Sequence, residues 1–356
     1  MRLFLSPVDV WLFRDGRPFS AGSDHRAESL FPPPPSVVQG ALRSHHLVIK
    51  GVPLHDRERV AEVVGTTTSF PAGFRIRGPF VAREEKEEAD STTSMHRYFP
   101  LPEDACNVSG REDVFRAVAP VTKNGILTRC PTPRLLLESG EPRKREGEWW
   151  LREDQMANYL KGQDVTAQRA DTLYVRELRP GISLDAGRRT TSEGMLFEAE
   201  YIRPRDGVGL EVRVDGLDGW PDSGVLRLGG ESRAARFLQL PPAPPAPAPA
   251  PLPERFKLCF ATPTYFERGW QPADWTTFFE GEADCVAAAV GRYRSIGGFD
   301  MAGSVGTEGV HKPARRYVPS GSVYFFESKG HSRLRTDFVC DDSAPIGWGQ
   351  VIVGTW

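Results

Sequence analysis

The chain has 356 residues, with 47 acidic and 45 basic side chains and a formal net charge of −2 at pH 7. This length predicts two domains that each bury a core, and the nearly neutral charge excludes a protein that coats nucleic acid by bulk attraction. The longest apolar runs fall far short of the roughly 20 residues of a membrane span, so we expect a soluble protein.

The first elements in chain order are a strand, a basic loop and a helix. Residues 2–13 are rich in aromatic and branched side chains, which predicts a strand. Four prolines at 32–35 forbid helix before Ser36, which we expect to be the N-cap. The unpaired N–H groups of a helix N-terminus bind anions. The loop before this helix carries Arg14, Arg17, His25 and Arg26. This pattern suits a phosphate backbone; a turn with local ion pairs and a rigid proline connector fits it as well.

The rest of the N-terminal part predicts further strands and one more helix. We expect short strands near residues 74–76 and 115–118, a helix near 153–161, and strands near 195–202 and 210–214. Residues 241–253 then contain eight prolines, which cannot form helix or central strand, so we place a domain boundary there.

The C-terminal part predicts a small α+β sandwich. Strands are expected at residues 256–262, 283–293, 317–327 and 350–354, with a short helix at 272–279 and a glycine loop after the second strand. Residues 286–336 hold eight basic side chains and three acidic ones, so this part is locally basic.

Two pairs of glycines lie close to arginines. Gly229 and Gly230 precede Arg233, and Gly297 and Gly298 follow Arg294. Glycine has no Cβ, so its amide can approach a phosphate oxygen closely. The same pairs would serve equally well as tight turns between sheet elements.

Arginine supplies all but eight of the 45 basic residues. Its planar guanidinium matches phosphates and base edges, which favours an RNA partner. A GC-rich genome would give the same excess of arginine, and the abundant Ala, Gly and Pro support that alternative.

The cysteines argue against a metal. The five cysteines, at 106, 130, 259, 285 and 340, never have CxxC spacing, which predicts a reducing cytoplasm and no zinc site. Pro7 and Asp9 interrupt the first apolar residues, so we expect no signal peptide. No known phosphate or cofactor motif is present, and we expect no cofactor.

The first and last blocks of the sequence are the most distinctive. Residues 12–19 read LFRDGRPF, residues 32–36 and 39–43 read PPPPS and QGALR, and the chain ends in GWGQVIVGTW. These blocks, with weaker ones at 180–185, 194–197, 228–233, 296–299, 312–313 and 318–326, closely resemble the third subunit of type III-B (Cmr) CRISPR effector complexes, a RAMP-superfamily protein. The resemblance spans essentially the whole chain.

The resemblance implies an α+β fold with two ferredoxin-like (βαββαβ) domains. Residues 1–240 would form the first, with inserted hairpins and a thumb hairpin at about 180–204, residues 241–253 the linker, and residues 254–356 the second. The implied function is that of a non-catalytic subunit in RNA-guided antiviral defence. It would bind the 5′ handle of the CRISPR RNA (crRNA), lie near the target RNA beside the handle, and bridge the large signalling subunit to the backbone RAMP subunits.

Pattern and resemblance together predict a set of RNA-binding residues. They are Arg14, Arg17, His25, Arg26, Ser36, Gln39, Arg43, Arg188, Arg189, Gly229, Gly230, Arg233, Arg294, Gly297, Gly298, Lys312, Arg315 and Arg316. Arg188 and Arg189 would form the tip of the thumb hairpin.

The alternative function is a metal-independent endoribonuclease that processes CRISPR RNA. His45 and His46 fall on the first helix, where related processing enzymes place a general base, His25 lies in the loop before it, and Tyr293 or Lys312 could assist. Adjacent helix residues point in different directions, so at most one of these two histidines could face a given site. We therefore expect no catalytic residue.

Overall fold

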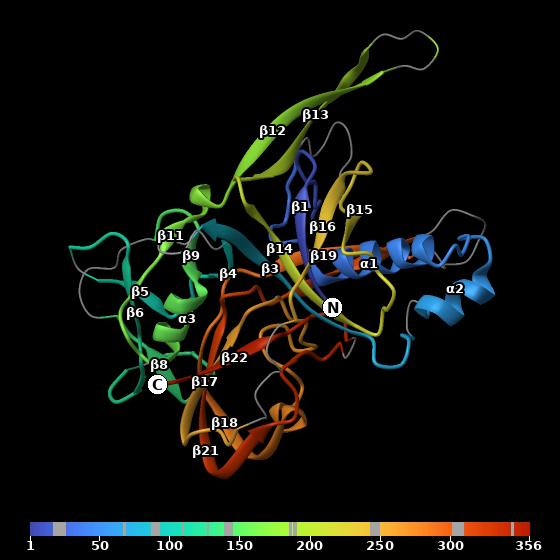
Figure 1. Ribbon diagram of the computed structural model, residues 1–356. Coiled ribbons are helices and arrows are strands. Elements are labelled where there is room, and N and C mark those ends of the chain that lie inside the picture. The colour runs from blue at the N-terminus through green and yellow to red at the C-terminus, as the bar shows by residue number, and fades with distance from the viewer. Residues whose placement is uncertain are drawn as a thin grey trace.

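The computed structural model describes residues 1–16, 26–66, 69–86, 93–108, 110–126, 128–138, 145–184, 187, 191–242, 250–300, 310–342 and 345–356. Within these ranges the protein is a mixed α/β structure made mostly of strands, with three α-helices (Figure 1). No α-helix among the described residues is long and apolar enough to cross a membrane.

A sheet of eight strands organises the N-terminal half. In spatial order its strands are β11 (Gln168–Arg169), β9 (Trp149–Arg152), β4 (Thr93–Pro100), β3 (Arg75–Lys86), β14 (Val208–Asp215), β1 (Arg2–Pro7), β16 (Ala234–Leu240) and β15 (Ser223–Arg227). β1 is antiparallel to both of its neighbours, β14 and β16. Its alternate residues Leu3 and Leu5 are fully buried, as the period of two in a strand requires.

Helix α1 (Pro35–Ile49) packs on one face of this sheet through Val38, Leu42 and His46. The N-cap is Pro34 and makes no side-chain hydrogen bond, so the expectation that Ser36 caps the helix is wrong. Proline has the φ of a helix and lacks an N–H that would stay unpaired in the first turn, so Pro35 starts the helix and Ser36 lies inside it. The short helices α2 (Arg57–Val64) and α3 (Glu153–Leu160) follow, and the predicted helix near 153–161 is confirmed.

The ferredoxin-like pattern is realised only in part. The chain order β1, α1, β3, β14, β16 gives the antiparallel spatial order β3-β14-β1-β16, with α1 as the crossover between β1 and β3. In place of a second helix, the described chain between β14 and β16 holds only the edge strand β15.

The C-terminal half is built on an antiparallel sheet of four strands. Its order is β18 (Phe279–Ala289), β21 (Val323–Leu334), β17 (Arg255–Phe260) and β22 (Val351–Thr355). The described residues of this half contain no α-helix. The expected helix at 272–279 is only a 3₁₀ turn, η2 (Trp275–Phe278), and the expected strand at 317–327 is broken by a turn in which Gly321 has a φ of +88°.

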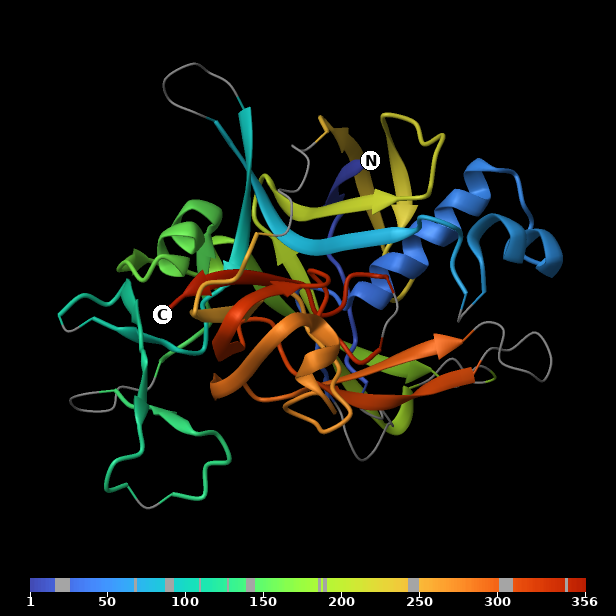
Figure 2. The same ribbon diagram turned by 90° about the horizontal axis from the view of Figure 1, so that it is seen from below.

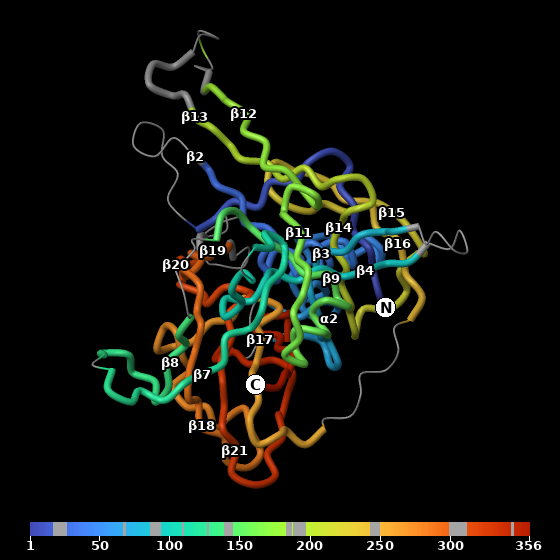
Figure 3. Tube along the Cα trace, turned by 90° about the vertical axis from the view of Figure 1, so that its left-hand side faces the viewer, coloured from blue at the N-terminus to red at the C-terminus, as the bar shows by residue number. Residues whose placement is uncertain are grey.

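The smaller sheets project from these two. A long hairpin of β12 (Tyr174–Leu184) and β13 (Thr191–Pro204) extends away from the body, and β2 (Arg26–Ala27) pairs with its base (Figures 1 and 3). A hairpin thus lies at residues 174–204, the position at which the thumb is expected. The remaining strands are β5 (Ala105–Asn107), β6 (Val114–Ala117), β7 (Pro120–Thr122), β8 (Arg134–Leu136), β10 (Val165–Thr166), β19 (Arg294–Asp300) and β20 (Val310–Tyr317); η1 (Ala170–Thr172) is a further 3₁₀ turn.

The two halves share hydrophobic clusters. Tyr317 and Trp348 of the C-terminal half are buried in the same cluster as Leu3 and Trp11. A second cluster joins Phe99 and Trp149 to Phe325 and others from the C-terminal sheet. Figure 2 shows the two halves lying against each other. The proposed boundary at 241–253 therefore separates segments that pack together.

Candidate nucleic-acid interface

The segment at residues 12–16 lies where three predicted motifs meet. The Gly16 N–H donates to the Ser295 carbonyl at 3.1 Å, and the Gly230 N–H donates to the Leu12 carbonyl at 2.8 Å. On a third side, the Asp15 N–H donates to the Glu28 carbonyl at 3.1 Å. The fold thus brings the first loop together with both glycine pairs, although these lie more than 200 residues further along the chain.

The protein's own backbone occupies the space beside two of the glycines at this junction. A Cβ on Gly16 would lie 2.5 Å from the Gly297 nitrogen. Gly229 has a φ of +95°, and a Cβ there would lie 2.8 Å from the Leu12 carbonyl oxygen. Gly230 and Gly298 are exposed. Gly229 and Gly230 form the expected turn, whereas Gly297 and Gly298 lie within strand β19 and not in the expected loop, because β20 pairs with that segment.

The β19–β20 hairpin carries an exposed set of cations. Arg294 and Lys312 are exposed and form no ion pair with any described residue. The Arg316 guanidinium lies 4.9 Å from the centre of the Tyr293 ring. Arg315 lies 5.0 Å from the Tyr265 ring and 3.7 Å from Asp342. A guanidinium beside an aromatic ring offers a further surface for an unstacked base, and a cation without an acidic partner suits a phosphate.

Arg233 belongs to a network at the base of the β12–β13 hairpin. The guanidiniums of Arg179 and Arg233 each lie 4.9 Å from the centre of the Tyr201 ring. Arg233 also pairs with Glu231 at 3.2 Å and with Asp9 at 3.6 Å. Its charge is therefore already shared with acidic partners in this structure.

Arg43 on α1 also has partners within the protein. It donates to the Thr66 carbonyl at 2.7 Å and lies 5.3 Å from the centre of the Phe70 ring. Burial lowers the pKa of its guanidinium. Ser36 and Gln39 are half-buried on the same helix. Arg43 thus connects α1 to the chain that enters β3, a role that the sequence did not indicate.

The remaining predicted residues are placed unevenly. Arg14 is exposed, and its backbone forms an isolated bridge with Ser29. Arg26 lies in β2, opposite Glu198 of β13. Arg17, His25, Arg188 and Arg189 fall outside the described residues.

Both helix histidines pack against one tryptophan. The Trp220 indole N–H donates to His46 Nδ1 at 3.0 Å, and the His45 ring lies 4.9 Å from the Trp220 ring. Both rings therefore lie against Trp220, which is large enough to span the two positions. Burial lowers the pKa of both histidines, which favours their neutral forms.

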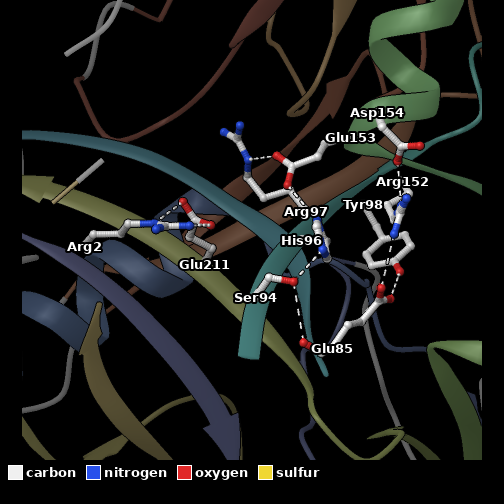
Figure 4. Close-up of polar contacts among 10 residues, drawn as sticks. All are labelled: Arg2, Glu85, Ser94, His96, Arg97, Tyr98, Arg152, Glu153, Asp154 and Glu211. Carbon is white, nitrogen blue, oxygen red and sulfur yellow. Dashed lines mark hydrogen bonds and ion pairs between the residues drawn. The ribbon is translucent and has the colours of Figure 1, made fainter. Parts of the chain in front are cut away.

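A second polar cluster joins β3 and β4 to β9 and α3 (Figure 4). His96 lies between Ser94 Oγ, 2.7 Å from its Nε2, and Glu153 Oε1, 3.3 Å from its Nδ1. Arg97 donates to the other Glu153 oxygen at 3.1 Å. Sequence reasoning missed this cluster, since its members are far apart in the chain.

The same view shows two further contacts. Glu85 accepts from the Tyr98 hydroxyl at 2.5 Å and from Arg152 at 3.3 Å (Figure 4). Burial and this bond raise the pKa of Tyr98 to about 12. On the neighbouring strands, Arg2 makes two hydrogen bonds to the fully buried Glu211, at 2.8 and 2.9 Å. These groups satisfy one another, so the cluster acts as a structural link. The described residues contain no group of His, Cys, Asp and Glu that could hold a metal ion.

Comparison with known proteins assigns the chain to a class and then to a family. Residues 3–356 match the family described as "CRISPR-associated protein (Cas_Cmr3)". The chain is therefore a CRISPR-associated protein. Because the match covers nearly the whole sequence, the chain belongs to the Cas_Cmr3 family. No curated protein matches it.

The solved structures that are similar to this chain include two from type III CRISPR complexes. One is the type III-B Cmr-beta bound to cognate target RNA, with 18% identity, a TM-score of 0.44, and coverage of 99% of this chain and 96% of that one. The other is the Csm3–Csm4 subcomplex of the type III-A CRISPR-Cas interference complex, with 10% identity, a TM-score of 0.34, and coverage of 94% and 99%.

Proposed function

We propose that this protein is a non-catalytic RNA-binding subunit of a type III-B CRISPR effector complex. It would hold the 5′ handle of the crRNA and bridge the large signalling subunit to the RAMP backbone. The observation that carries the proposal is the family match over residues 3–356. The meeting of the first loop with the basic β19–β20 hairpin supports it further.

The chemistry of the hairpin suits single-stranded RNA. Arg294 and Lys312 form no ion pair with any described residue, while Arg316 lies near the Tyr293 ring and Arg315 near the Tyr265 ring, where it also pairs with Asp342. Phosphate contacts would position the strand, and splayed bases would stack on the flat guanidiniums. Because Arg43 and Arg233 already have partners in the protein, we assign them to the framework of the site and not to direct phosphate binding.

The surroundings of the histidines favour a scaffold over a nuclease. A general base must accept a proton from the substrate, and His46 already accepts a hydrogen bond from buried Trp220. The alternative function, a metal-independent endoribonuclease that processes CRISPR RNA, would require His45 or His25 to act instead.

RNA binding at several salt concentrations tests the proposal. We expect the Arg294→Ala, Lys312→Ala double variant to bind a labelled repeat-derived 5′-handle RNA more weakly, with a salt slope smaller by about 0.7 per lost phosphate contact. Arg57→Ala with Arg59→Ala on α2 removes two exposed charges elsewhere and should change neither value. An unchanged slope in the hairpin variant would contradict the assignment of the site.

Incubation with repeat RNA separates the scaffold from the nuclease. The purified chain with EDTA should leave repeat RNA intact over the time in which it binds the handle. Specific cleavage that is lost in His45→Ala would reject the scaffold and establish the alternative.

A further inference from the structure

Three arginines lie side by side on three adjacent strands of the eight-stranded sheet. Arg213 of β14 lies opposite Arg2 of β1 on one side and opposite Arg77 of β3 on the other. We call these three residues the arginine row. Residues next to them in sequence are buried in the core under α1, so the row projects from the other face of the sheet. The three side chains, in the order Arg2, Arg213 and Arg77, are 20%, 27% and 26% exposed, so a small molecule can reach all of them.

A β-bulge brings Arg77 into this row. Glu211 lies opposite Phe80. A regular ladder would therefore place Gly78 opposite Arg213, two residues further along. The register shifts between these pairs, and Arg77 lies opposite Arg213 instead. Because side chains alternate between the faces of a strand, Arg77 would point to the α1 side without this shift. Bulges are frequent beside functional sites, where they redirect a side chain.

The carboxylates around the row are bound by its two outer members. The fully buried Glu211 accepts two hydrogen bonds from Arg2 (Figure 4). Asp337 and Asp215 lie 3.1 and 3.7 Å from nitrogens of Arg77. Each outer arginine therefore has its charge compensated within the protein.

The middle member, Arg213, has no hydrogen-bonded partner. Its Nε is buried and forms no hydrogen bond with any described residue. Glu211 lies 3.6 Å away, which is too far for a hydrogen bond, and its oxygens already accept from Arg2. Burial and the positive charge of Arg97 lower the pKa of the Arg213 guanidinium. Like charges directly opposite each other destabilise a sheet, and a half-buried cation with unmatched donors adds to that cost. Both features indicate that an anion completes the row.

The chemistry of the row favours a phosphate group as this anion. A phosphate carries several strong acceptor oxygens, and the planar fork of an arginine matches two of them at once. The carboxylate of a protein side chain has only two oxygens and would satisfy one fork. Adjacent strands lie about 4.8 Å apart, so a phosphate over Arg213 would also come within reach of the two outer arginines.

We propose that the arginine row binds a phosphate group, carried either by a free nucleotide or by an RNA strand. Arg213 would bind two of its oxygens, and Arg2 and Arg77 would surround it with positive charge. None of the three is among the residues assigned to the 5′ handle, so the proposal does not depend on the proposed function.

Calorimetric titration tests the site. The protein would be titrated with inorganic phosphate, adenosine monophosphate and oligouridine RNA at constant ionic strength. We expect Arg213→Gln to weaken the binding of phosphate-bearing probes about tenfold or more, because it removes charge-assisted hydrogen bonds. Arg213→Lys keeps the charge without the fork and should also bind more weakly than the wild type.

Arg83→Gln is the matched control. It removes a half-buried charge from β3, opposite the core residue Val208 and therefore on the α1 side of the same sheet. All affinities should stay at their wild-type values in this variant. Equal losses in Arg83→Gln and Arg213→Gln would show a general effect of net charge and overturn the site.

Melting temperatures separate a binding role from a structural one. Arg213 makes no hydrogen bond with the described residues, so Arg213→Gln should melt at or above the wild-type temperature when no phosphate is present. The probe that binds should raise the melting temperature of the wild type and not that of the variant. A variant that melts well below the wild type without phosphate would make Arg213 a structural residue and contradict the proposal.

The three probes identify the source of the phosphate. A loss with adenosine monophosphate would assign the row to a free nucleotide, and a loss with oligouridine alone would assign it to an RNA strand. No binding by the wild type, or equal affinities of wild type and Arg213→Gln for every probe, would overturn the proposal. So would a loss of binding to another protein subunit with no change for any probe, which would assign the row to a protein carboxylate. Handle-RNA binding that is unchanged in the Arg294→Ala, Lys312→Ala variant would count against the proposed function alone.

Discussion

Lys257 and Asp104 form an ion pair in which both side chains are almost completely buried, 1% and 0% exposed, with Nζ 3.3 Å from Oδ2. The Tyr159 hydroxyl donates to the other carboxylate oxygen, and the ammonium lies 3.6 Å from the centre of the Tyr159 ring. Lys257 comes from β17, while Asp104 and Tyr159 come from the chain before the proline-rich segment. The pair therefore joins the two halves of the molecule inside their shared core.

Removing one member of this pair should destabilise the protein strongly. Asp104→Asn leaves a buried ammonium without its counter-charge, and we expect a loss of about 3–5 kcal/mol in the free energy of unfolding. The double variant Asp104→Asn, Lys257→Met removes both charges and should lose less. Urea denaturation followed by tryptophan fluorescence gives both values. If the single variant is as stable as the wild type, the pair does not hold the halves together.

The acid sensitivity of folding should depend on His46. Burial lowers the pKa of His46 in the folded protein, so the unfolded chain binds a proton more readily. The free energy of unfolding should therefore be greatest above about pH 6.5, the ordinary histidine pKa, and fall as the pH drops toward the folded pKa.

His46→Gln keeps a hydrogen-bond acceptor for Trp220 but does not titrate. Denaturation at pH 7.5 and 5.5 should show a smaller acid loss in this variant than in the wild type. His55→Gln, at an exposed position, should keep the wild-type loss. Identical pH profiles for all three proteins would exclude His46 as the cause.

Two glycine substitutions should act in opposite directions. Gly229→Ala places a Cβ 2.8 Å from the Leu12 carbonyl oxygen at a φ of +95° and should cost about 1–3 kcal/mol of stability. Gly40→Ala lies in α1 with no atom within 4 Å of the new Cβ and should add about 0.5–1 kcal/mol. Thermal melts of the two variants check the signs. A neutral Gly229→Ala would mean that this turn can move away from Leu12.

The outer end of the β12–β13 hairpin should be dispensable for folding. Replacing residues 185–190 by a Gly-Ser turn leaves the pair Ile182–Leu196 and all pairs below it. We expect an unchanged melting temperature and unchanged handle binding. In the assembled complex, chemical probing of the guide–target duplex beside the handle should change, as expected of a thumb. A wild-type probing pattern would reject that role.

The sequence predicted elements where one local signal dominated. The helix near 153–161 and the strand at 350–354 follow from regular apolar spacing, and both are confirmed within a residue or two. The sequence-based predictions failed where pairing with another strand determined the local structure. The glycines at 297–298 read as a loop, but pairing with β20 draws them into a strand.

The candidate site was predictable as a list of residues and not as an arrangement. The basic loop and the glycine pairs could be named, yet only the fold shows that Gly16 meets Ser295 and that Gly230 meets Leu12. Nothing in the sequence indicated that Arg233 pairs with Asp9 and lies over the Tyr201 ring, because these contacts join distant segments. Such pairings decide which arginines keep a free charge.

The β12–β13 hairpin is joined by backbone pairing to the N-terminal segment at two points. Trp11 exchanges two backbone hydrogen bonds with Ile202 of β13, at 2.8 and 2.9 Å. Ala27 of β2 pairs with Ala199 on the same strand, on the far side of the first loop. The β13 strand of the hairpin is therefore bound to the chain on both sides of the first loop. We therefore expect a displacement of the hairpin to move the segment at residues 12–16, which meets the β19–β20 hairpin through Gly16 and Ser295.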